Sequence, residues 1–104
     1  MAQVKINPGI CGFHTVVTVT ADEDMQVQVA IESGCPAVAA MQAELQGLDG
    51  YGEVLGQWGS STISKVGAAR CTHAACPVPS GIIKGVEVAC GLALPAPVTF
   101  DISK

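Results

Sequence analysis

The sequence predicts an α+β fold of two layers, in which helices pack on one face of an antiparallel-rich sheet. The first third of the 104-residue chain alternates apolar and polar residues, as half-buried strands do. Between residues 36 and 90, apolar residues recur every three or four positions, as in amphipathic helices. A short alternating stretch returns near the C-terminus. The expected order is therefore three strands, four helices and a last strand.

Three strands are expected at the start of the chain. Val4 to Ile6 is a short first strand, and Thr15 to Thr20 is rich in β-branched residues that favour strands. Gln26 to Glu32 has valine or isoleucine at alternate positions, so its apolar side chains share one face. The residues Ala21 to Asp24 between the last two strands are polar enough to form a turn. The pattern predicts a hairpin.

A helix is expected at the start of the middle part of the chain. Val38, Met41 and Leu45 would share one face of a helix over residues 36–46. A glycine break follows, and then a stripe at similar spacing that is interpreted as core: Leu48, Tyr51, Leu55 and Trp58.

Two further helices and one strand complete the prediction. Ser60 or Ser61 can cap a short helix that ends at Arg70. A longer helix over residues 77–90 has an apolar stripe: Ile82, Ile83, Val86, Ala89 and Cys90. The last strand is predicted from the alternation of Val98, Phe100 and Ile102. No linker or repeat divides the chain, so residues 1–104 are expected to form a single domain.

Composition excludes several classes of function. Hydrophobic residues make up 49% of the chain and charged residues 13%, so a folded aliphatic core is expected. The net charge is -4 and no basic cluster is available to neutralise phosphates, which argues against nucleic acid as a partner. The start MAQVKINPGICGF does not resemble a signal peptide, and no apolar run approaches the roughly 18 residues of a membrane span. A cytoplasmic location is expected.

Cytoplasmic thiols are normally reduced, so the five cysteines are interpreted as ligands or reactive groups before disulfides. In an antiparallel arrangement, the loop after the first strand and the end of the third strand lie at the same end of the sheet. That topology places Cys11 and Cys35 together. Proline follows both Cys35 and Cys76, as is usual at the first position of a helix, where the helix dipole favours a thiolate.

A soft-metal site is the chemistry that best uses such a set of thiolates, holding zinc or an iron–sulfur cluster. The predicted ligands are Cys11, Cys35, Cys71 and Cys76, with His73 as an additional candidate. Cys90 lies on an apolar helical stripe and is interpreted as core packing. Packing remains the alternative for the other cysteines too, because free cysteine is among the most buried residue types.

Two segments carry a resemblance to known families: SGCPAVAAMQAEL (Ser33 to Leu45) and CTHAACPVPSGIIKGVEVA (Cys71 to Ala89). Over nearly its whole length the chain is similar to a family of small uncharacterised proteins of anaerobic bacteria and archaea. Its layout also resembles U-type iron–sulfur scaffold proteins and TSCPD domains. The resemblance implies that Cys35 and Cys76 are cluster ligands and Cys71 the third. The acidic residue that the scaffolds carry near their first cysteine is not found after Cys35.

Residues 76–79, Cys-Pro-Val-Pro, resemble the Cys-Pro-x-Pro motif of small sulfur-carrier proteins of the TusA type. In that family the cysteine carries a persulfide and the motif follows the first strand, whereas here the motif lies late in the chain. The resemblance implies that Cys76 is the reactive thiol of a sulfur carrier.

Three functions therefore stay open. The first is a non-catalytic protein that binds a soft metal or cluster. The second is a thiol or persulfide carrier with Cys76 as nucleophile, and the third is a structural or partner-binding domain whose cysteines only pack. The first two imply a protein partner that receives the cluster or the sulfur. A cluster shared between two chains of a homodimer also remains open.

Overall fold

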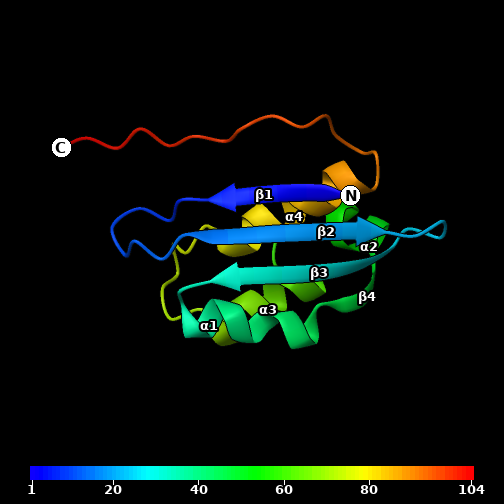
Figure 1. The fold of residues 1–104 in the computed structure, drawn as a ribbon, viewed down its shortest axis with the longest axis horizontal. Helices are drawn as coiled ribbons and strands as arrows, with labels where there is room; N and C mark the ends of the chain where they lie inside the picture. Colours follow the sequence, from blue (N-terminus) through cyan, green and yellow to red (C-terminus); the bar gives the residue numbers. More distant parts are fainter.

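The computed structural model describes residues 1–104 and contains one four-stranded sheet in the order β1-β2-β3-β4 (Figure 1). The strands are β1 (Ala2–Ile6), β2 (Thr15–Ala21), β3 (Gln26–Ser33) and β4 (Gln46–Asp49), and all neighbours are antiparallel. The predicted α+β class and the three N-terminal strands are confirmed. The turn after β2 is closed by Asp22, whose Oδ1 accepts hydrogen bonds from the N–H groups of Asp24 and Gln26.

The alternation of side chains gives the sheet one apolar face. Val19 of β2 pairs with Val29 of β3, and both are buried. Their neighbours Thr18 and Ala30 form another pair and point to the opposite face, which no helix covers. The apolar face is therefore the one that must be covered.

The helices supply that cover. They are α1 (Pro36–Ala39), the 3-10 helix η1 (Ala40–Glu44), α2 (Gly50–Leu55), α3 (Thr62–Arg70) and α4 (Val78–Ala89). In Figure 1, α2, α3 and α4 lie behind the sheet, with α4 against β1 and β2, and α1 lies below β3. The core between the layers is aliphatic, as the composition indicates: Val17, Val19, Val27, Val29, Val38, Met41, Leu45, Ile63, Val78, Ile82, Val86 and Cys90.

The last two helices have the predicted ends. Ser61 caps α3, and its Oγ accepts a hydrogen bond of 3.1 Å from the N–H of Ser64. At the end of α4, Gly91 has a φ of 72°, which favours glycine, and its N–H donates to the carbonyl of Val88. The N–H of Leu92 donates to the carbonyl of Glu87 at 2.8 Å, so α4 ends in a Schellman motif.

The predicted helix over residues 36–46 is wrong in its second half. After α1 the chain tightens into η1 and then enters β4 at Gln46. The N–H of Val29 in β3 donates to the carbonyl of Leu45, which begins the contact between the segment and the sheet. The unpaired backbone groups at the edge of β3 favour a strand partner over another helical turn.

Of the stripe predicted as core, Leu48 packs against the core, but Tyr51, Leu55 and Trp58 are exposed, contrary to the prediction. Leu48 lies in β4, and α2 has only six residues, so the spacing does not describe one helix. Leu55 is 71% exposed and Trp58 81%. The side chain that α2 buries is that of Glu53, which is 7% exposed and caps α3. Its two carboxylate oxygens accept hydrogen bonds from the first two N–H groups of α3, at 3.2 and 3.0 Å.

The predicted C-terminal strand does not form within the chain. No helix or strand follows α4, and the segment after Leu92 extends alongside β1 and away from the sheet (Figure 1). Phe100 is 79% exposed and Ile102 89%. The alternation is present, but the segment pairs with no strand of the sheet. No helix of the structure has the length and hydropathy to cross a membrane.

Candidate functional site

Cys11 and Cys35 lie beyond the same end of the sheet. Ile6 at the end of β1 pairs with Thr15, and Thr15 pairs with Ser33 at the end of β3. The loop that contains Cys11 and the residue Cys35 therefore leave the sheet at the same end, as the topology predicts.

Hydroxyl groups hold the backbone at Cys35. Its N–H donates to the Oγ of Ser33 at 3.1 Å, and that oxygen lies 2.8 Å from the Oγ1 of the buried Thr15. The carbonyl of Cys35 accepts from the N–H of Ala39, so the cysteine is the N-cap of α1. Thr15 and Ser33 were not identified from the sequence as supporting residues, although their places at strand ends are visible in the alternation.

Cys71 and Cys76 flank the loop between α3 and α4. The N–H of Cys71 donates to the carbonyl of Gly67 at 2.8 Å, which closes the last turn of α3. The N–H of Cys76 donates to the carbonyl of His73 at 3.2 Å, and Cys76 precedes Pro77, the N-cap of α4. The short loop folds back on itself, so its two ends are close.

A close contact between α3 and α4 fixes the ends of this loop. A Cβ atom added to Gly67 would lie 2.5 Å from the Cγ of Pro79, nearer than atoms can pack. Glycine at this position therefore lets the end of α3 approach the start of α4. The contact positions Cys71 beside Cys76.

The thiols of these segments interact. Burial raises the pKa of Cys71 to about 12, with further contributions from side-chain hydrogen bonding to Cys76 and from the charges of Cys76 and Cys35. All three cysteines are partly buried and pack against the core. Cys71 is therefore a protonated thiol at neutral pH, and ionisation of one sulfur opposes ionisation of the next.

The three thiols do not form a closed coordination shell as they stand. No group of three or more His, Cys, Asp or Glu side chains is arranged to hold a metal ion. Thiolates bind zinc at about 2.3 Å, so the sulfurs of Cys35, Cys71 and Cys76 would have to converge on one point to hold it.

The two other candidate ligands lie outside this contact. Cys11 is exposed in the loop between β1 and β2, and the thiol interactions of Cys71 do not include it. His73 is exposed in the loop between α3 and α4, where its Nδ1 lies 3.4 Å from the Oγ1 of Thr72.

Cys90 is separate from the site. It belongs to the core cluster, and a Cβ atom added to Gly50 would lie 2.4 Å from its Sγ. Burial raises the pKa of Cys90, and the negative charge of Asp49 raises it further. Its position agrees with the interpretation of Cys90 as a packing residue.

The sequence of the chain matches one protein family over residues 2–102. The chain belongs to DUF6951, a family of unknown function. No curated protein and no solved structure matches the chain. The resemblance of this DUF6951 chain to iron–sulfur scaffolds therefore depends on the cysteine motifs alone.

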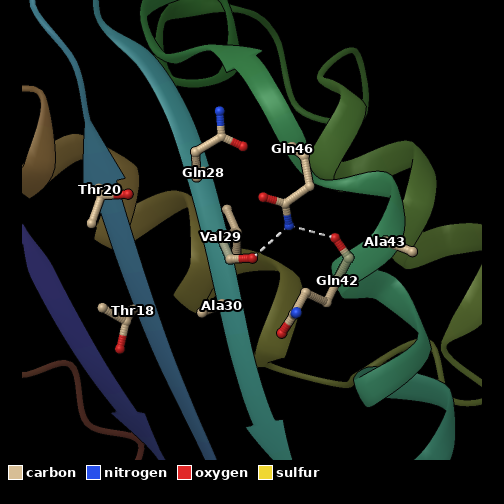
Figure 2. Close-up of a pocket in the computed structure, with 8 residues that line it drawn as sticks. All are labelled: Thr18, Thr20, Gln28, Val29, Ala30, Gln42, Ala43 and Gln46. Atoms are coloured by element: carbon tan, nitrogen blue, oxygen red, sulfur yellow. Dashed lines mark hydrogen bonds between the residues drawn. The ribbon is translucent and has the colours of Figure 1, made fainter.

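This DUF6951 protein has a hollow beside β3, in which the amide groups of Gln42 and Gln46 already form hydrogen bonds (Figure 2). The Nε2 of Gln46 donates to the carbonyls of Val29 and Gln42, both at 2.7 Å. The Oε1 of Gln42 accepts from the N–H of Ile31 at 2.7 Å. These side chains replace backbone partners where β4 is too short to cover β3. The hollow is a structural feature of the sheet edge.

Proposed function

We propose that this protein binds a soft metal, as zinc or an iron–sulfur cluster, through Cys35, Cys71 and Cys76. The observation that supports the proposal is that the partly buried thiol of Cys71 interacts with Cys76, across one short loop, and with Cys35, which is distant in the sequence. Thiolates are the preferred protein ligands of zinc and of iron–sulfur clusters.

Metal binding would change the charge balance of the site. Ionised thiols close together repel one another, and a divalent cation removes that repulsion because it deprotonates and neutralises them. The proposal therefore includes release of protons on metal binding and convergence of the three sulfurs on the cation.

A fourth ligand would complete tetrahedral coordination. Cys11 is our first candidate, because its loop leaves the same end of the sheet as Cys35. His73 is the second candidate, because it lies between Cys71 and Cys76 in the same short loop. An open fourth position would suit a protein that passes a cluster to a partner, as the resemblance to scaffold proteins implies.

A sulfur carrier is the second candidate function. Cys76 directly precedes the Pro77-Val78-Pro79 start of α4, a helix of twelve residues, and its side chain is partly exposed. As a carrier, the Cys76 thiolate would attack the outer sulfur of a donor persulfide. The donor S–S bond would break, the donor thiolate would leave, and Cys76 would hold the persulfide.

One preparation distinguishes the two functions. The protein is purified without oxygen, and its zinc, iron and acid-labile sulfide are measured together with the absorption spectrum and the intact mass. Stoichiometric iron and sulfide, or stoichiometric zinc, supports the metal proposal. Protein without metal, and with one added sulfur located on Cys76 by peptide mass spectrometry, supports the carrier.

A further inference from the structure

The C-terminal segment has the side-chain pattern of a strand but no partner in the chain. Val98, Phe100 and Ile102 alternate with Thr99 and Asp101, and all three apolar side chains are at least 62% exposed. Alternation of this kind is useful only when one face of the strand is buried. The segment is therefore suited to addition to the edge of a sheet.

We propose that residues 97–102 pair with the β1 edge of a second copy of this chain, so that two copies exchange their C-terminal segments in a symmetric dimer. Each sheet would gain a fifth strand beside β1. The proposal is independent of the cysteine site and does not require metal.

The free edge of the sheet is β1. At the opposite edge, β4 pairs with β3, and the amides of Gln42 and Gln46 bond the next backbone groups of β3 (Figure 2). On β1, the hydrogen bonds outside the regular ladders include no residue of Ala2–Ile6. The outward N–H and C=O groups of β1 are therefore available to another strand.

The side chains of the two strands match. Val4 and Ile6 of β1 face the helix layer and are only half buried, because no strand lies beyond them. A Cβ atom added to Gly81 of α4 would lie 2.6 Å from the Cδ1 of Ile6, so α4 lies directly over β1. A strand beside β1 with Val98, Phe100 and Ile102 on the same face would extend this apolar layer.

Charge on the other face is complementary. Lys5 of β1 is exposed on the face that no helix covers, and the added strand would place Asp101 on that face. Opposite charges on neighbouring strands stabilise the pairing.

The residues that connect α4 to the C-terminal segment favour pairing with a second copy over pairing within the same chain. Pro95 and Pro97 have fixed φ angles and no N–H, so the residues after α4 favour an extended path. In Figure 1 the segment runs along β1 without pairing and continues beyond the sheet. The six residues from Leu92 to Pro97 can span up to about 20 Å, so the connection lets residues 97–102 extend away from their own sheet.

Sedimentation equilibrium of the full chain and of a chain that ends at Pro95 tests the proposal. Both are measured with chelator and reductant, so that neither a shared metal nor a disulfide can hold a dimer. We expect a dimer for the full chain and a monomer with unchanged circular dichroism for the shortened chain. A monomeric full chain, or a shortened chain that still dimerises, would overturn the proposal.

Single substitutions locate the contact. Phe100→Asp should weaken dimerisation by at least about tenfold, because it removes a buried aromatic ring. Thr99→Asp, on the opposite face of the same segment, should have a much smaller effect. Lys5→Glu should weaken the dimer, and Asp101→Lys added to it should restore part of the loss. Equal effects of the Phe100 and Thr99 substitutions, or slow amide exchange of the segment in a monomer, would contradict strand exchange.

Discussion

The thiols of Cys71 and Cys76 interact across the loop that joins α3 to α4, and Cys35 adds a third sulfur nearby. The three cysteines are the N-cap of α1, the C-cap of α3 and the residue before the N-cap of α4. Burial, together with this proximity, raises the pKa of Cys71 and keeps its thiol protonated at neutral pH. The same proximity would hold three thiolates around a soft cation.

The stability of the metal-free protein should fall at alkaline pH because of Cys71. Its pKa is about 12 in the folded chain against an ordinary value of 9.0, so the folded state holds a proton that the unfolded state loses. The contribution of the protonated Cys71 thiol to folding stability is therefore full below pH 9 and is lost as the pH rises toward 12. The free energy of unfolding is measured by urea denaturation at several pH values between these limits, with chelator present. It should fall more steeply with pH for the wild type than for Cys71→Ser. Equal slopes would contradict the raised pKa of Cys71.

Cys71 should also react slowly with alkylating reagents, because the thiolate is the nucleophile and its formation is opposed. At pH 8, in metal-free protein, peptide mass spectrometry should show modification of the exposed Cys11 well before Cys71. Substitution of Cys76 by serine should accelerate the reaction of Cys71, because one source of the raised pKa is removed. Rapid labelling of Cys71 in the wild type would argue against the thiol interactions.

Gly67→Ala should separate the two helices that position the loop. The new methyl group would meet Pro79, and overpacking of this kind costs about 1–3 kcal/mol. We expect weaker metal binding as well as lower stability, because Cys71 and Cys76 would move apart. The matched control is Ala68→Gly on the exposed side of α3, which costs about 1 kcal/mol of helix stability without touching α4. Equal metal affinity in both variants would contradict a positioning role for Gly67.

Glu53→Ala should destabilise the fold by about 2 kcal/mol, because two N–H groups at the start of α3 lose their acceptor in a buried place. Urea denaturation of the metal-free protein measures the change. Glu44→Ala is the control, since its ion pair with Arg70 is exposed and should contribute less than about 1 kcal/mol. A smaller loss for Glu53 than for Glu44 would show that the buried carboxylate is not a cap.

Elements with local signals could be predicted from the sequence. The strands β1 to β3 follow from alternation, α3 from its serine cap, and α4 from one long apolar stripe and its final glycine. Their ends depend on residues next to them in the chain. For the same reason the position of Cys11 and Cys35 at one end of the sheet follows from three short strands and their turns.

Elements that depend on distant partners could not be predicted. β4 forms because the edge of β3 needs a partner, and nothing within Gln46–Asp49 itself favours a strand. The burial of Glu53 depends on the N-terminus of α3 ten residues later. The cysteine motifs indicated which thiols matter, but the proximity of Cys71 to Cys35 depends on the packing of α3 against α1.

Titration of the metal-free protein with Co²⁺ tests the metal proposal most directly. Thiolate coordination gives intense near-ultraviolet charge-transfer absorption, and binding should release protons. We expect one Co²⁺ per site in the wild type and in Cys90→Ala, and binding weakened at least about tenfold when Cys35, Cys71 or Cys76 is replaced by serine. Cys11→Ser then shows whether Cys11 is the fourth ligand. No charge-transfer absorption in the wild type, or unchanged affinity after loss of Cys71 or Cys76, would contradict the proposal.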